Sequence, residues 1–200
     1  MTRRIVRLFF GLVLCGWGIA AMVAADLGLG PWDVLHEGLA DRTGIGIGAV
    51  SIIVGGLVLL VWLPLRERPG PGTVANVIII GVVIDVTLLV LDTPSSLLAR
   101  LALCAAGPVL FGVGSGFYLG SRFGSGPRDG LMTGLARRGI SVAVARTGIE
   151  VTALAVGWLL GGTVGLGTVL FAATIGPLVQ WSLRHLTVVV PPPEGVRSAR

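Results

Sequence analysis

The chain has 200 residues, of which 54% are apolar and only 12% are charged, and its mean hydropathy of +0.92 is far above that of water-soluble domains. This composition excludes a water-soluble domain and predicts an integral membrane protein embedded in the lipid bilayer. The 15 basic residues are all arginines. They lie at the ends of apolar segments, which indicates a role in membrane topology and excludes a nucleic-acid partner.

The first apolar segment follows a cluster of arginines, an arrangement that resembles a secretory signal peptide. A counterpart of this segment lies inside the chain, which favours a retained membrane span over a cleaved signal. Cys15 and Cys104 both fall inside apolar segments. We therefore predict two buried free thiols and no disulfide framework.

Uncharged segments long enough to cross a membrane recur along the chain, since about 20 helical residues span a hydrocarbon core of about 30 Å. The uncharged run from Val151 to Leu183 is too long for one span, and Gly161 with Gly162 supplies a turn within it. The tail 188–200 is predicted to leave the membrane as a disordered cytoplasmic segment. We predict six spans: residues 5–27, 46–64, 73–91, 101–121, 141–160 and 166–186.

A short motif occurs twice, as GLGPWDVLHEGL at 28–39 and as GSGPRDGLMTGL at 124–135, with an offset of 96 residues. Proline after Gly-x-Gly suits the first turn of a helix, and an Asp two residues later lies at the positive helix end. We predict short helices over 31–42 and 127–138, each half a membrane long and either interfacial or dipping into the bundle. The matching motif residues are Gly28, Gly30, Pro31 and Asp33 in the first copy and Gly124, Gly126, Pro127 and Asp129 in the second.

Two interpretations of this paired motif stay open. The motif can form two sharp corners in which Asp33 and Asp129 only cap the amides that follow them. Alternatively, two half-helix N-termini converge on a central cavity and present free N–H groups to a solute, as discontinuous helices do in several transporter folds.

The duplication extends over nearly the whole chain and predicts two repeats, 1–97 and 98–187. Each repeat holds three spans, and because three is an odd number the second repeat must enter the bilayer from the opposite side. The sequence thus predicts an all-α membrane protein built from two inverted three-helix repeats. Six spans place the four Arg-rich segments on one side, which predicts that both termini lie in the cytoplasm.

Three ionisable residues, Asp85, Arg146 and Glu150, lie well inside predicted spans, where unpaired charges are costly. Arg146 and Glu150 are one helical turn apart and can pair directly. We predict that Asp85 competes with Glu150 for the Arg146 guanidinium and that these residues bind a solute or a coupling proton. A purely structural ion pair is the alternative. The aligned positions in the other repeat are uncharged: Gln180, Ser51 and Gly55.

The two histidines, His36 and His185, lie at loop and span ends. Neither has Cys, His or carboxylate neighbours at metal-ligand spacing. We predict that both are solvated or interfacial and that the chain binds no metal and no cofactor.

The GLGPWDVL and GSGPRDGLMTGL elements, the RTGIEV segment at 146–151 and the GLGT…GP segment at 165–177 resemble the YczE/YitT-like family of bacterial integral membrane proteins. The resemblance covers about residues 8–185. It implies a small multi-span protein of the plasma membrane, and no biochemical activity is carried over from it.

The leading functional hypothesis is a secondary transporter or permease for a small polar or anionic solute, with proton coupling. Its basis is the inverted repeat, the paired half-helix starts and the intramembrane charges. The alternative is a non-catalytic accessory or scaffold protein that stabilises a partner complex. The abundant glycines favour close helix packing, within the chain or in a homodimer. No nucleophile–base pair or phosphate loop is visible, so we predict that the protein is not an enzyme.

Overall fold

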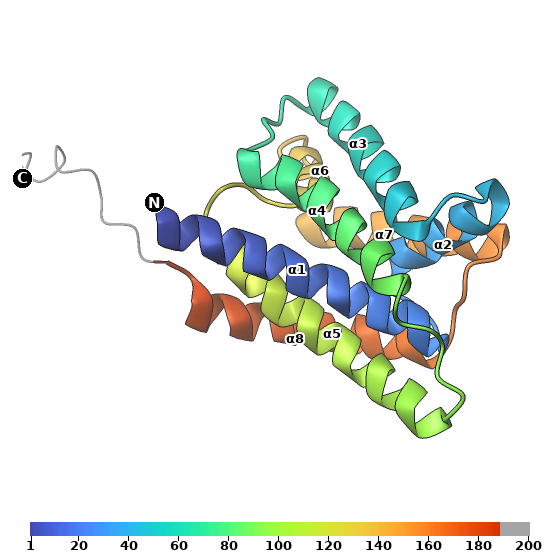
Figure 1. Cartoon of the computed structure of the whole chain (residues 1–200). Coiled ribbons are helices and arrows are strands. Elements are labelled where there is room, and N and C mark those ends of the chain that lie inside the picture. Colours follow the sequence, from blue (N-terminus) through green and yellow to red (C-terminus); the bar gives the residue numbers. More distant parts are fainter. Residues whose placement is uncertain (189–200) are drawn as a thin grey trace, which may run out of the picture.

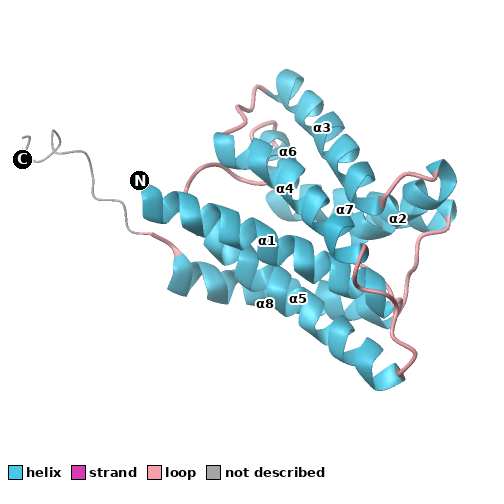
Figure 2. Cartoon of the chain, in the orientation of Figure 1, coloured by secondary structure: helices cyan, strands magenta, loops and turns pink. Residues whose placement is uncertain are grey.

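The structure is a computed structural model that describes residues 1–188. In this range the chain forms helices joined by loops, as Figure 2 shows. The predicted tail lies outside the described residues except for Val188. In chain order the helices are α1 (Thr2–Ala25), α2 (Pro31–Thr43), α3 (Ile47–Leu65), α4 (Pro71–Leu88), α5 (Leu97–Gly120), α6 (Pro127–Ala136), α7 (Val142–Leu160) and α8 (Leu166–Leu186).

Six of these helices are long and apolar enough to cross a membrane, namely α1, α3, α4, α5, α7 and α8. The predicted all-α membrane fold is therefore confirmed. The two remaining helices, α2 and α6, begin at Pro31 and Pro127, where proline loses no hydrogen bond. Helix α6 ends two residues before its predicted end, because the chain turns back there with Gly139 at a φ of 93°.

The centre of the bundle is the crossing of α1 and α5, which lie side by side in Figure 1. The backbone of Gly11 lies against Gly114, and the backbone of Gly18 lies against Gly107. A Cβ atom built on any of these glycines would lie 2.6 to 2.9 Å from an atom of the partner helix. The reversed order of the two contacts shows that α1 and α5 run antiparallel. Small residues allow this close approach between spans.

The two halves of the chain exchange their short helices. Helix α2 packs against α7, and α6 packs against α3, while α1 packs on α4 and α5 packs on α8. The loops before the short helices cross in the same way, because Gly167 N donates to Leu27 O at 2.8 Å and Gly72 N donates to Phe123 O at 3.0 Å. Each half therefore needs the other to hold its short helix in place.

Arginines at equivalent positions of the two halves hold helix ends across the molecule. Arg4 Nε donates to Ser121 O at 2.9 Å, and Arg100 Nε donates to Ala25 O at 2.7 Å. These carbonyls follow the last turns of α5 and α1, where backbone acceptors lack intrahelical partners. The motif pair Arg42 and Arg138 does the same for α7 and α3, through Leu160 O and Pro64 O. These arginines therefore hold helix ends together, in addition to their predicted role in setting the membrane topology.

Candidate functional site

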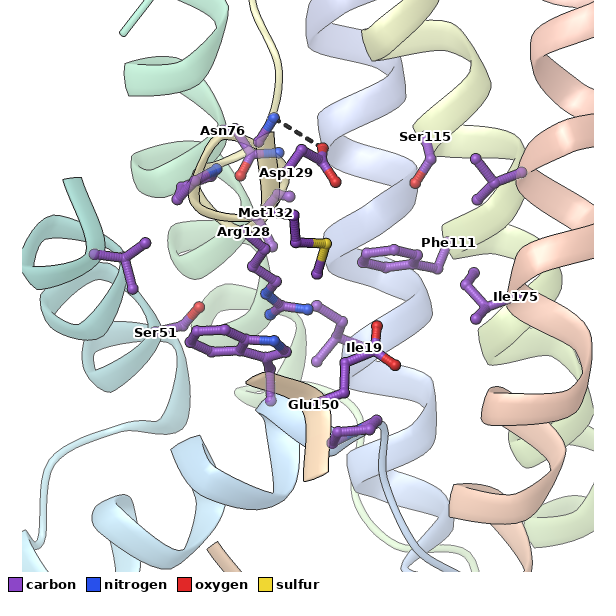
Figure 3. Close-up of a pocket in the computed structure, with 18 of the residues that line it drawn as sticks. Ile19, Ser51, Asn76, Phe111, Ser115, Arg128, Asp129, Met132, Glu150 and Ile175 are labelled. Carbon is purple, nitrogen blue, oxygen red and sulfur yellow. Dashed lines mark hydrogen bonds between the residues drawn. The ribbon is translucent and has the colours of Figure 1, made fainter. Parts of the chain in front are cut away.

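A cavity of about 280 Å³ lies between the two halves, and all eight described helices contribute to its wall. Pockets for small molecules usually begin at about 300 Å³, so the cavity suits a small solute. Its lining is mixed, as Figure 3 shows: Arg128 and Ser51 lie on one side, with Phe111 and Ile175 on the other.

Both short helices begin at this cavity. Pro31 of α2 and Pro127 of α6 line it, so two helix N-termini, each with unpaired N–H groups and a partial positive charge, lie at its wall. Gly28 and Gly124 make the preceding turns with φ values of 105° and 133°, a conformation that favours glycine. The repeated motif therefore places two equivalent helix starts in one cavity.

The two aspartates of the motif have different surroundings, and Asp129 acts as a cap. Gly126 N donates to Asp129 Oδ2 at 3.1 Å, and the Tyr118 hydroxyl donates to the same oxygen at 3.4 Å. Burial raises the pKa of the Asp129 carboxyl, and the hydrogen bond from Gly126 opposes this shift. For Asp129, the capping interpretation describes the geometry.

Asp33 is buried, with 2% of its surface exposed, and it does not cap its helix through Oδ1. This oxygen lies 3.4 Å from His36 Nδ1 and 3.8 Å from Arg128 Nη2. Among the described residues, Asp33 Oδ1, His36 Nδ1 and Trp32 Nε1 are all buried without a hydrogen-bond partner. Buried polar atoms are nearly always hydrogen-bonded. Trp32 and His36 also line the cavity, whereas Asp33 lies behind its wall, so Trp32 Nε1 and His36 Nδ1 mark a place for a polar ligand or water.

The prediction that His36 is solvated or interfacial is wrong. Only 3% of its surface is exposed, and its side chain lines the cavity. The reason is that α2 packs against α7 and α3, which covers His36. Burial lowers the pKa of His36, while the neighbouring Asp33 opposes that shift.

Arg128 is the functional candidate that the sequence analysis missed, because it was counted among the loop arginines. Its guanidinium carbon lies 4.9 Å from the centre of the Trp32 ring, a cation–π geometry. Trp32 and Arg128 occupy the same motif position in the two copies, so equivalent residues meet across the cavity. One signal in the sequence could have identified Arg128: it is a charged residue between the proline and the aspartate of the motif, at the start of a predicted helix.

Arg146 and Glu150 do form the predicted pair. Arg146 Nε lies 3.0 Å from Glu150 Oε1, one turn apart on α7, and both residues line the cavity. Their side chains are 48% and 34% exposed. Whether they bind a solute or a proton stays a prediction.

Asp85 is not brought to this pair, contrary to the expectation that it shares the Arg146 guanidinium. Its two carboxylate oxygens accept hydrogen bonds from Gly48 N at 2.7 Å and Ala49 N at 2.8 Å. These amides belong to the first turn of α3, where the helix has no other partners for them. Asp85 therefore caps a neighbouring helix and lies outside the cavity wall.

A family model described as a family of unknown function, DUF6198, matches residues 2–184 of the chain. An uncharacterized protein of Haemophilus influenzae is 43% identical over 177 residues, which cover 88% of this chain and 81% of that protein. The uncharacterized membrane protein YczE of Bacillus subtilis is 35% identical over 178 residues, covering 88% of this chain and 83% of YczE. The chain belongs to the DUF6198 family.

The YczE-like resemblance carried by the repeated motif is thus confirmed. DUF6198 membership, the similarity to a membrane protein and the six apolar helices together establish a multi-pass membrane protein. No solved structure matches the chain.

Proposed function

We propose that the protein is a secondary transporter or permease for a small polar or anionic solute across the bacterial plasma membrane. The observation that carries the proposal is the central cavity, whose wall holds two equivalent helix N-termini, Arg128, and the buried atoms Trp32 Nε1 and His36 Nδ1, which have no hydrogen-bond partner among the described residues. Discontinuous helices at the interface of two repeats form the solute sites of several transporter folds.

The proposal includes two inverted halves with both termini in the cytoplasm. The antiparallel crossing of the equivalent helices α1 and α5 supports inversion, as does the odd number of spans in each half. The Arg-rich segments support the orientation, because cytoplasmic loops carry an excess of basic residues.

Arg128 is the residue to which we assign the anionic group of the solute. Its contact with Asp33 at 3.8 Å is too long for a hydrogen bond, so its planar donors are available to a second acceptor. Trp32 Nε1 lies in the same wall as a further donor without a partner among the described residues. A small carboxylate or similar anion fits these donors.

We assign proton coupling to the cavity acids Asp129 and Glu150. Burial raises the pKa of Asp129, so its carboxyl binds a proton at a higher pH than an exposed aspartate. Glu150 is held by Arg146, which a solute anion can engage in its place. Uptake of solute and proton together would keep the charge of the cavity balanced.

The test is flux into proteoliposomes that contain the purified protein, measured with a broad panel of small metabolites in the presence and absence of a proton gradient. We expect at least one small anion or polar solute to be moved. The variant Arg128→Ala should lose this flux, while Arg68→Ala, which removes an exposed arginine outside the cavity, should retain it. Absence of flux for the whole panel contradicts the proposal.

The accessory role is the second candidate, and the exposure of Arg146 on a predicted span favours it. A charge in the membrane normally faces protein or water, so a partner protein or a second copy of this chain could cover it. Purification in mild detergent separates the two functions. A stoichiometric foreign partner supports the accessory role, whereas a monomer or homodimer that moves solute supports transport.

A further inference from the structure

The last two spans of each half, α3 and α4 in the first and α7 and α8 in the second, face each other along a line that we call a seam. The seam between α3 and α4 is closed. The backbones of Gly48 and Gly81 are in contact, so that a Cβ on Gly81 would lie 2.5 Å from Gly48 O. Beside this contact, Asp85 of α4 accepts hydrogen bonds from the first-turn amides of α3, at Gly48 and Ala49. A carboxylate on a helix N-terminus gains from hydrogen bonds and from the helix dipole together.

The equivalent seam between α7 and α8 is not closed. Helix α8 packs on α5, and within residues 1–188 it has no comparable packing along α7. The counterparts of Gly48, Gly81 and Asp85 are Ala143, Gly176 and Gln180, and Val144 is the counterpart of Ala49. A Cβ on Gly176 would meet no atom within 4 Å.

The side chains at the open seam are accordingly free of the contacts that close the other. Val144 N donates to Ser141 Oγ of its own helix at 3.3 Å, and no residue of α8 caps this turn among the described contacts. Gln180 lines the cavity instead, as do Arg146 and Glu150, whose side chains are partly exposed.

The two seams lie toward opposite faces of the bundle. The closed seam joins the start of α3 to the end of α4, near the face where Arg100 contacts the end of α1. The open seam lies between the start of α7 and the end of α8, near the Arg-rich face. By the orientation proposed above, the cavity is closed toward the outside and open toward the cytoplasm.

We propose that Asp85 is a positioning residue that holds the outer seam closed, and that transport proceeds by exchanging the two seams. In the opposite state α7 closes on α8 through Ala143 and Gly176, while Asp85 releases α3 and the cavity opens outward. Alternation between two repeats around a fixed site produces such an exchange. This inference rests on the proposed transport function.

The first test is a disulfide between Ala143→Cys and Gly176→Cys, in a background with Cys15→Ala and Cys104→Ala. Both positions have room for a cysteine side chain. In oxidised membranes we expect the cross-link to form, and Asp85→Asn should increase its rate about tenfold or more, since a charged acceptor is lost. A control pair at Ala143 and Val169 should not cross-link, because both lie in the first turns of α7 and α8, which run in opposite directions across the membrane.

The second test is labelling of Ser51→Cys, which lines the cavity, by a membrane-impermeant maleimide in the same background. With Asp85 intact, we expect labelling mainly from the cytoplasmic face. Asp85→Asn should raise labelling from the outside at least several-fold. The matched control Asp92→Asn changes an exposed acid just after α4 and should leave the sidedness unchanged.

Absence of the cross-link in both backgrounds overturns the exchange of seams, and unchanged sidedness in Asp85→Asn overturns the role of Asp85. If Asp85→Asn does not reach the membrane, the cross-link with Asp85 intact still decides whether the seams exchange. Solute flux without movement of the seams refutes this inference alone. Movement of the seams without flux of any solute refutes the proposed transport function alone.

Discussion

At the scale of single residues, the start of α2 and the start of α6 use the same motif for different purposes. Asp129 is satisfied by Gly126 N and the Tyr118 hydroxyl, whereas Asp33 Oδ1 has no hydrogen bond among the described residues. The charged neighbours differ as well, because Arg128, at the motif position equivalent to Trp32, lies against the Trp32 ring and 3.8 Å from Asp33. An asymmetric site has therefore developed from a symmetric motif.

For Arg128→Ala we expect a loss of about tenfold to a hundredfold in the apparent affinity for the transported anion, the range typical of a hydrogen bond to a charged group. The melting temperature in detergent should change little, because the side chain is partly exposed and its contact with Asp33 is long. Flux against solute concentration, with Arg128→Lys as the conservative variant, measures the effect. Unchanged affinity would remove Arg128 from the site.

The burial of His36 predicts that the stability of the protein depends on pH. Its pKa is lowered by burial, with Asp33 and Arg128 as its charged neighbours. As pH falls through about 6.5, the unfolded chain binds a proton that the folded chain does not, so stability is present above this pH and is lost below it. We expect detergent melts of His36→Asn to lose less stability than the native chain between about pH 7 and pH 5. The control His185→Asn alters an exposed histidine; if it has the same effect, His36 is not the source.

At the scale of elements, the crossing of α1 and α5 depends on glycines at equivalent positions of the two halves. Gly18 lies on Gly107, and Gly11 lies on Gly114, with main-chain atoms in direct contact. No larger residue fits without separating the helices, since interiors are close-packed.

Gly18→Val should therefore destabilise the protein by about 1–3 kcal/mol or more, the usual cost of overpacking. Thermal unfolding in detergent measures this loss. Gly56→Val is the matched control, because a Cβ on Gly56 of α3 meets no atom within 4 Å. Equal losses in both variants would show that valine in a span, and not the crossing, causes the effect.

At the scale of the whole molecule, the exchange of short helices makes one unit of the two halves. Each short helix packs mainly on the other half, α2 on α7 and α6 on α3, in addition to smaller contacts with its own half. The arginine contacts link the halves in the same way: Arg4 of the first half contacts the end of α5, and Arg100 of the second half contacts the end of α1.

The topology has a direct test in single cysteines at exposed loop positions, in a background without Cys15 and Cys104. We expect Asp41→Cys to react with an impermeant maleimide from outside the cell and Ile140→Cys to react only from the cytoplasm. Both positions are exposed, unlike His36 and Met132 in the motif itself. Reaction of both from the same side would show that the two halves are not inverted.

The sequence by itself determined that the chain is an integral membrane protein with long apolar helices, and that two short helices start at Pro31 and Pro127. These features follow from hydropathy, charge and proline chemistry, which act locally along the chain. It also placed Arg146 beside Glu150, because a one-turn spacing on a helix suffices. The tertiary structure alone decided which residues from distant segments meet. It placed Asp85 on the amides of α3, Arg128 on Trp32 and His36 in the interior, because these contacts depend on how the two halves pack, and no local pattern records that packing.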